Sequence, residues 1–249
     1  MRSPIPTVDA YGHLRINVRF SYKTEPQDVI AVMDSLNIEF VAVTASPTCW
    51  NDARSGNEQA KQVLLQHGRS FRGYVTVNPH VPGEAIGKSN AGGISIRRLS
   101  LSHTPAFSNM RWMDRNTSRS GTMPIRLELW FWCTRGSHTH IVGRCSFPNW
   151  ARAHPKSFDL LGHSGVTWRG YGQALEAAVS TSNLYLDLSG SQRHRSTLER
   201  CVHRIGAECI VFGSDMPALE TDGTLANVLT AAIGDAEKKR SCVITSCGS

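Results

Sequence analysis

A chain of 249 residues can bury one large core, and an α/β barrel of about 250 residues forms a single domain. No stretch approaches the roughly 18 consecutive apolar residues of a membrane span, and the N-terminus lacks the apolar block of a secretory signal. The net charge of +7 raises the question of a nucleic-acid partner, but six of those charges lie in residues 94–147, with eight arginines, two acidic residues and no lysine. We expect a cytoplasmic protein with one domain over residues 1–249.

The cysteine pattern excludes two classes of small, cross-linked fold. The seven cysteines are odd in number and include no CxxC pair. Neither a disulfide framework nor a zinc ribbon fits this pattern. Reduced thiols are therefore the expected state.

The first third of the chain alternates strand and helix patterns. The first predicted strand lies in PTVDAYGHL, residues 6–14, and ends among polar side chains. A helix over residues 25–37 has Pro26 in its first turn. Then come a strand at 40–45, a helix at 56–68 that stops at a glycine, a strand at 71–78 and the start of a helix at 83–88. This alternation is typical of a parallel sheet covered by helices.

The alternation breaks between residues 94 and 147, where neither the period of a strand nor that of a helix is clear. Trp112, Trp130 and Trp132 lie there among arginines and serines, which superficially suits phosphate contacts and base stacking. A structureless loop of this length inside a compact domain argues against any assignment that needs it. Two of the expected strands, the fourth and the fifth, would have to lie here, so we expect them to be degraded or irregular.

The alternation resumes after residue 151. Strands are predicted at residues 158–161, 184–188 and 209–212, and helices at 171–181, 196–205 and 224–240. Each of the three strands ends at polar groups: His163 in the first, Asp187 and Ser189 in the second, Asp215 in the third. The chemistry of parallel α/β folds collects at the carboxyl ends of the strands. Residues 241–249 lack a helical pattern and are predicted to form an irregular tail.

The unusual composition of segment 94–147 can be explained by translation in a shifted reading frame. The stretch WFWCTRG, residues 130–136, can be back-translated and read from the third base of its first codon. This frame forces Val-Leu-Val and permits His-Thr-Trp, which is a buried strand ending in a histidine. We infer that segment 94–147 is translated out of frame between two compensating frameshifts, which explains its arginines without a nucleic-acid partner.

Outside that segment, the chain resembles the amidohydrolase superfamily, in particular the metal-dependent TIM-barrel proteins that include the aminocarboxymuconate-semialdehyde decarboxylases. The stretches that carry the resemblance are VDAYGHL, YVTVNPHVPGEAI, ARAHP, LLGHSG, LYLDLSGS and FGSDMP, and their order and spacing make it specific. The resemblance implies a (β/α)8 TIM barrel. It also implies one or two divalent metal ions, with zinc as the expected one, bound by histidines and an aspartate at the strand ends.

By this resemblance, three residues are the predicted metal ligands. His13 matches the second histidine of the first-strand motif, His163 the sixth-strand histidine and Asp215 the eighth-strand aspartate. His163 and Asp215 are also the predicted catalytic residues. Tyr11 stands where the first histidine of the motif is usual, and the fourth- and fifth-strand groups are absent.

The other polar residues near these strand ends have simpler interpretations. Asp9 either binds backbone at its strand end or belongs to the site, and both readings stay open. Asp187 and Ser189 are interpreted mainly as strand and loop structure. Four further histidines are expected to be solvated or to lie in turns: His80, His154, His194 and His203.

The first expectation for function is a metal-dependent hydrolase. The metal would activate water for attack on a C–N or ester bond of a small molecule, and Asp215 would bind the metal or carry the proton. Two alternatives stay open: nonoxidative decarboxylation of a small aromatic or unsaturated acid, and a catalytically inactive barrel or pseudogene product. We expect a small-molecule substrate and neither a nucleic-acid nor a membrane partner, and the sequence is compatible with a homo-oligomer.

Sequencing the gene across codons 90–152 tests the frameshift hypothesis. We expect the alternative frame to open and close at the two edges of segment 94–147 and to encode a strand ending in histidine at codons 130–136. An in-frame reading confirmed in the DNA, with the same residues in close homologues, would contradict it.

Overall fold

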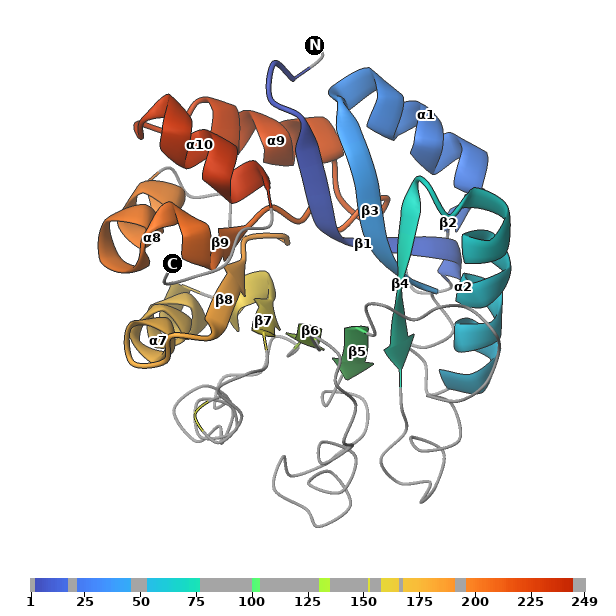
Figure 1. The fold of residues 1–249 in the computed structure, drawn as a ribbon, viewed down its shortest axis with the longest axis horizontal. Coiled ribbons are helices and arrows are strands. Elements are labelled where there is room, and N and C mark those ends of the chain that lie inside the picture. Colours follow the sequence, from blue (N-terminus) through green and yellow to red (C-terminus); the bar gives the residue numbers. More distant parts are fainter. Residues whose placement is uncertain are drawn as a thin grey trace.

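The computed structural model describes residues 3–17, 22–45, 53–76, 100–103, 130–134, 152, 158–165, 168–190 and 196–243. Within these ranges, nine strands form one sheet in the order β2-β1-β3-β4-β5-β6-β7-β8-β9 (Figure 1). The short β2 (Tyr22–Thr24) pairs antiparallel with β1 (Thr7–Asn17). All the other neighbouring strands are parallel. The predicted parallel α/β arrangement is confirmed.

The parallel strands after β1 come from the whole length of the chain. They are β3 (Ile38–Ala45), β4 (Phe71–Thr76), β5 (Ser100–His103), β6 (Trp130–Thr134), β7 (Phe158–Gly162), β8 (Leu184–Asp187) and β9 (Ile210–Val211). Strand β8 is buried on both faces, as the burial of all four of its residues shows. This is why the run that leads into Asp187 is apolar.

Strands β5 and β6 lie inside segment 94–147, where irregular strands were predicted. β6 pairs with β5 and with β7, and β5 pairs with β4 over residues 100–102, all without a register shift. The prediction that these strands are irregular is therefore wrong for residues 100–103 and 130–134. The tryptophans, phenylalanine and threonine of β6 favour a strand, and runs of four or five residues are too short for a periodicity test. The remainder of segment 94–147 lies outside the described residues, and the reading-frame hypothesis stays a prediction.

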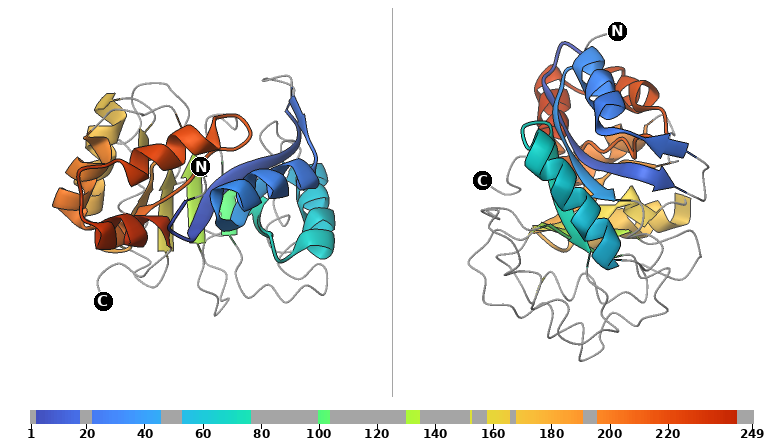
Figure 2. Two further views of the ribbon diagram at one scale, coloured as in Figure 1. Left: turned by 90° about the horizontal axis from the view of Figure 1, so that it is seen from above. Right: turned by 90° about the vertical axis from the view of Figure 1, so that its right-hand side faces the viewer.

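The helices lie outside the sheet, α1 and α2 beside the early strands and α7 to α10 beside the late ones (Figures 1 and 2). They are α1 (Pro26–Leu36), α2 (Ala53–His67), α7 (Trp168–Val179), α8 (Thr197–Ile205), α9 (Thr221–Leu229) and α10 (Asp235–Cys242). Short 3-10 turns cover His163–Gly165 and Ala207–Cys209. The helix predicted to begin at residues 83–88 lies outside the described residues. None of the helices described here is both long enough and apolar enough to cross a bilayer.

Local signals set the limits of the helices. At α1, Glu25 and Asp28 form a capping box, in which the Glu25 N–H donates to Asp28 Oδ2 at 3.2 Å, and Asn37 ends the helix with a φ of 64°. The helix predicted at 224–240 is instead two helices. Gly234 begins the second one, and its N–H donates to the Glu237 side chain at 2.7 Å. Because α10 runs to Cys242, the predicted tail starts later than residue 241, and residues 244–249 lie outside the described part.

Backbone hydrogen bonds join the first strand to the segment after the last one. Ala10 N–H donates to the Phe212 carbonyl at 2.9 Å, and Asp215 N–H donates to the Tyr11 carbonyl at 2.9 Å. His13 N–H donates to the Met216 carbonyl at 2.7 Å. One hydrophobic cluster also joins Leu14 of β1 to Phe212 and to Cys242 of α10. Strand β1 therefore contacts both β3 and residues 212–216, which brings the polar ends of the first and last strands together.

The cysteines differ in state. Cys201 and Cys242 are buried free thiols, whereas Cys209 is disulfide-bonded. The expectation of reduced thiols is therefore wrong for Cys209. Spacing along the chain carries no information on which distant cysteines meet in the fold.

Candidate functional site

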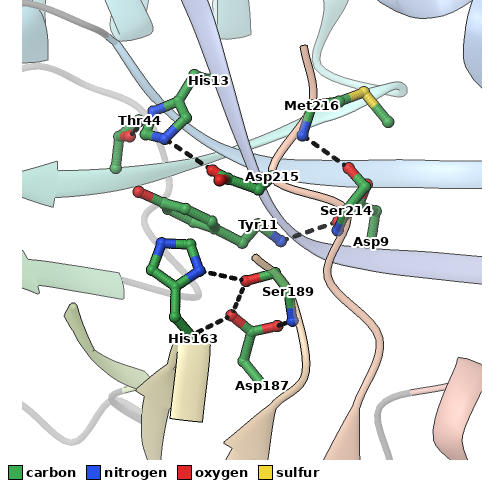
Figure 3. Close-up of polar contacts among 10 residues, drawn as sticks. All are labelled: Asp9, Tyr11, His13, Thr44, His163, Asp187, Ser189, Ser214, Asp215 and Met216. Atoms are coloured by element: carbon green, nitrogen blue, oxygen red, sulfur yellow. Dashed lines mark hydrogen bonds and ion pairs between the residues drawn. The ribbon is translucent and has the colours of Figure 1, made fainter. Parts of the chain in front are cut away.

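Polar side chains from five strands meet at one edge of the sheet (Figure 3). They come from the carboxyl-terminal part of each strand or from the residues just after it, and parallel strands place such positions on the same side. The set comprises His13 of β1, Thr44 of β3, His163 after β7, Asp187 and Ser189 at the end of β8, and Asp215 after β9.

His13 and Asp215 form the first half of this site. His13 Nε2 lies 3.1 Å from Asp215 Oδ1, and His13 Nδ1 lies 2.9 Å from the hydroxyl oxygen of Thr44. Their side chains are only 9% and 14% exposed, so the contact is largely shielded from water. His13 and Thr44 are register partners on neighbouring strands. The Thr44 hydroxyl therefore holds the imidazole at Nδ1, and the contact of Nε2 with Asp215 becomes an ion pair when His13 is protonated.

The backbone of Asp215 aims its carboxyl group back towards β1. Asp215 has a φ of 61°, in the left-handed region that aspartate tolerates better than most residues. Its N–H donates to the Tyr11 carbonyl, and its own carbonyl accepts the Ala218 N–H at 2.9 Å. This turn is what places the carboxyl group beside His13.

Tyr11 lies between the two histidines of the predicted metal site (Figure 3). Its ring centroid is 4.7 Å from that of His13 and 5.5 Å from that of His163, and both contacts are edge-to-face. The structure thus brings His13 and Asp215 together but leaves His163 on the other side of a tyrosine ring.

The described residues do not make a complete metal site. Among them, no group of three or more His, Cys, Asp or Glu side chains is placed to hold a metal ion. A catalytic zinc ion takes about three protein ligands. His13 and Asp215 supply two donors, and Tyr11 separates the third predicted ligand, His163, from them.

His163 belongs to a second cluster with Asp187 and Ser189. Its Nδ1 lies 2.9 Å from Ser189 Oγ, and its backbone N–H donates to Asp187 Oδ2 at 3.1 Å. The Ser189 hydroxyl also donates to Asp187 Oδ2, and the Ser189 N–H donates to Oδ1 at 2.8 Å. Burial raises the pKa of Asp187, while these hydrogen bonds, and His163 when it is protonated, lower it. Asp187 and Ser189, interpreted from the sequence mainly as structural, therefore contact a predicted catalytic histidine.

The turn that carries His163 is strained, and β8 holds it. His163 and Ser164 have φ values of 56° and 41°, each of which costs about 1–3 kcal/mol for such a residue. The Ser164 hydroxyl donates to the Asp187 carbonyl at 2.6 Å. Strain of this kind persists only where surrounding contacts impose it, and here Asp187 supplies them through its backbone and its side chain.

Two glycines make room for this cluster. A Cβ at Gly190, whose φ is 93°, would lie 2.8 Å from His163 Nδ1, and a Cβ at Gly213 would overlap Asp187 Oδ1. These are the glycines of the LSG and FGS stretches. Their position beside polar strand ends was the signal that could have pointed to the Asp187 cluster from the sequence.

Asp9 is buried and joins the two ends of the sheet. Its Oδ1 accepts the backbone N–H groups of Tyr11 and of Ser214, each at 3.0 Å, so its backbone-binding interpretation is confirmed. Burial raises the pKa of Asp9 to about 7, and the charge of Asp187 adds to the rise, although hydrogen bonds from Ser214 and Tyr11 oppose it. The carboxyl group thus changes charge near neutral pH.

Sequence reasoning missed Thr44 and Tyr74. The Tyr74 hydroxyl donates to the Ala10 carbonyl at 2.6 Å, and burial, with the charges of Asp187 and Asp9, raises the pKa of Tyr74 well above its usual value. Both residues lie in ordinary strand patterns, so nothing local marks them. Of the histidines expected to be solvated, His203 is exposed on α8, and His80, His154 and His194 lie outside the described residues.

Comparisons with known proteins identify solved structures that have a similar fold. The sequence matches no protein-family model and no curated protein. Among solved structures, the chain is similar to 2,6-dihydroxybenzoate decarboxylase in complex with 2,6-dihydroxybenzoate, with a TM-score of 0.72, 12% identity and 97% of each chain covered. It is also similar to an amidohydrolase from Burkholderia multivorans with bound zinc, with a TM-score of 0.70, 12% identity and 95% of each chain covered.

A third similar structure is dihydroxybenzoic acid decarboxylase from Polaromonas sp. JS666, with bound manganese and the inhibitor 2-nitroresorcinol. Its TM-score is 0.65 and its identity 13%, and the match covers 97% of this chain and 95% of that one. At such identities, the similarity shows the fold alone, and the chemistry has to be argued from the residues.

Replacing Asp9 with asparagine is expected to remove a pH dependence of stability. Asp9 titrates at about 7 in the folded state and near 3.8 when unfolded, so the folded state keeps a proton that the unfolded chain releases between these values. The free energy of unfolding of the wild type therefore declines as the pH rises from about 4 to 7, by on the order of a few kcal/mol. An asparagine side chain would keep the acceptor oxygen and bury no charge. In Asp9→Asn, the free energy of unfolding should therefore not show this decline with rising pH.

Chemical denaturation between pH 4 and pH 8 measures this difference. Asp34→Asn, a change at an exposed position of α1, is the matched control and should follow the wild type. The same decline in Asp9→Asn as in the wild type would show that Asp9 does not titrate as described.

Proposed function

We propose that this chain, which has the fold of the amidohydrolase superfamily, is an enzyme that hydrolyses a C–N or ester bond of a small molecule. The proposed site is the edge where the carboxyl ends of the parallel strands meet. The observation that carries the proposal is the shielded contact between His13 Nε2 and Asp215 Oδ1. A carboxylate beside an imidazole can take a proton from water and return it to a leaving group.

We also infer that the sheet is a (β/α)8 barrel. Strands β1 and β3 to β9 are parallel and consecutive, and the hydrogen bonds of β1 to residues 212–216 link the two ends of the series. A parallel bridge between Gly12 and Met216 supports the same inference. In such a barrel, the catalytic groups come from the carboxyl ends of several strands, as His13 and Asp215 do here.

In the proposed hydrolysis, Asp215 acts as the general base. Its carboxylate takes a proton from a water molecule as the water oxygen attacks the carbonyl carbon of the substrate. The C–N or C–O bond then breaks, and the proton passes from Asp215 to the leaving nitrogen or oxygen. Thr44 holds His13 at Nδ1, so that His13 Nε2 faces Asp215 Oδ1 in a pair that is largely shielded from water.

The proposal includes a divalent cation. Zinc is present in the similar amidohydrolase from B. multivorans, and manganese in the similar decarboxylase from Polaromonas. His13 and Asp215 are the donors that the described part of this chain offers. A cation bound there would polarise a carbonyl group or lower the pKa of a bound water. Because two donors do not complete a site, no step above passes through the cation.

Decarboxylation of a small aromatic acid is the second candidate, favoured by the two decarboxylases among the similar structures. In that reaction the C–C bond to the carboxylate breaks and CO2 leaves. Protonated Asp215 then gives its proton to the ring carbon that lost CO2. The same His13 and Asp215 pair serves both reactions, so the products must distinguish them.

Asp215→Asn should reduce turnover by about 10²–10⁴-fold, because it removes the group that accepts and returns the proton. The purified protein is assayed against small esters, amides and dihydroxybenzoates with added zinc or manganese. Release of an acid from an ester or amide supports the hydrolase, and release of CO2 supports the decarboxylase.

The matched control for this assay is Asp34→Asn, which should have wild-type activity. No turnover of any of these substrates by the wild type would support the remaining alternative, an inactive chain. Equal activity in Asp215→Asn and the wild type would contradict the role of Asp215.

Tyr11→His should raise the affinity for zinc or manganese. A histidine in place of the Tyr11 ring would add a donor between His13 and His163. Changes to groups that only surround metal ligands already alter metal affinity by about 10–100-fold, so an added donor should raise the affinity by at least about tenfold. Titration calorimetry measures the affinity. Tyr11→Phe is the matched control, since it keeps a ring without adding a donor, and an equal affinity in both variants would contradict the prediction.

A further inference from the structure

We infer that Ser189 and Asp187 are positioning residues that hold the neutral His163 imidazole with its proton on Nδ1, so that Nε2 keeps its lone pair. The basis is the chain of contacts from the Asp187 carboxyl through the Ser189 hydroxyl to His163 Nδ1 (Figure 3). All three residues lie at the carboxyl ends of the neighbouring strands β7 and β8.

The single proton of a serine hydroxyl determines which group donates in each of these two hydrogen bonds. A serine hydroxyl has one proton to donate and lone pairs to accept with. The Ser189 hydroxyl donates its proton to Asp187 Oδ2. At the 2.9 Å contact with His163 Nδ1, Ser189 Oγ can then only accept, so the proton of that hydrogen bond belongs to Nδ1.

The groups around Asp187 keep it the acceptor, and the Ser189 hydroxyl the donor, in the hydrogen bond between them. Its two carboxyl oxygens accept the Ser189 N–H at 2.8 Å, the His163 N–H at 3.1 Å and the Ser189 hydroxyl. The two backbone N–H groups, one at each oxygen, favour the ionised carboxylate, which has no proton to give to Ser189 and can only accept from it. Asp187 is fully buried, so water does not compete for those positions.

The backbone keeps His163 within reach of Ser189. His163 N–H and the Ser164 hydroxyl both bond to Asp187, which holds the left-handed turn in place. Gly190 follows Ser189 and lies so close to His163 Nδ1 that a side chain there would push the ring away. The imidazole is therefore positioned by β8 from two directions.

The consequence for function is a second basic nitrogen in the site. A neutral imidazole with its proton on Nδ1 has its lone pair on Nε2, which is then the nitrogen that can act as a base or as a ligand. With the proton on Nε2, it could do neither there. This consequence rests on the proposed function, and it places His163 and Asp215 as two bases on opposite sides of Tyr11.

Nitrogen-15 NMR of the histidine rings tests the inference without measuring turnover. The His163 signals are identified by their loss in His163→Gln, and spectra are recorded at a pH where the ring is neutral. We expect the wild type to show a protonated Nδ1 and an unprotonated Nε2. In Ser189→Ala the single tautomer should be lost, and Ser189→Thr, which restores the hydroxyl, should recover it.

Ser241→Ala is the matched control, because Ser241 is as buried as Ser189 but lies on α10 and should leave the His163 signals unchanged. A protonated Nε2 in the wild type would overturn the inference, even if no Ser189 variant folds. The wild-type tautomer persisting in folded Ser189→Ala would overturn it as well. Either result would leave the Asp215→Asn assay unaffected, so failure of this inference is distinguishable from failure of the proposed function.

Discussion

The buried carboxyl group of Asp9 is the contact on which the candidate site depends. One of its oxygens accepts backbone N–H groups from both Tyr11 and Ser214, so it ties the first strand to the residues that follow the last one. His13 lies two residues beyond Tyr11, and Asp215 follows Ser214. The Asp9 contact adds to the direct backbone hydrogen bonds of β1 with residues 212–216, and together they keep His13 close to Asp215. The raised pKa of Asp9 indicates that this connection is made by a group that gains charge near neutral pH.

Tyr11 divides the site into two halves, and the histidine of each half is held by different residues. On one side, the Thr44 hydroxyl contacts Nδ1 of the His13 ring, and Asp215 lies beside Nε2. On the other, the Asp187 and Ser189 network holds His163 at Nδ1. Each half is an imidazole oriented by a hydroxyl group, and each includes a carboxyl group with little or no exposure. The arrangement suits proton transfer on both sides of a ring that occupies the space between the two histidines.

The sequence was sufficient to predict the order of most elements and to predict that the candidate site lies at the carboxyl ends of the strands. Short apolar runs ending in His163, Asp187 and Asp215 predicted neighbouring parallel strands, because strands buried on both faces must be continuously apolar. It was insufficient for β5 and β6, which are too short to show a period, and for the break at Gly234 between α9 and α10. The pairing of His13 with Asp215 was accessible only through the family resemblance. The separation by Tyr11 and the hydroxyl contacts of Thr44 and Ser189 depend on register between distant strands, which local pattern does not encode.

Residues 212–216 and β1 together place Asp215 against His13, with Tyr11 between the two histidines. A crystal structure of the protein grown with zinc or manganese would show whether this arrangement forms. We expect a distance of about 3 Å between His13 Nε2 and an Asp215 oxygen, and the Tyr11 ring between His13 and His163. Tyr11 displaced, with His13, His163 and Asp215 all about 2.0–2.2 Å from one metal ion, would contradict it.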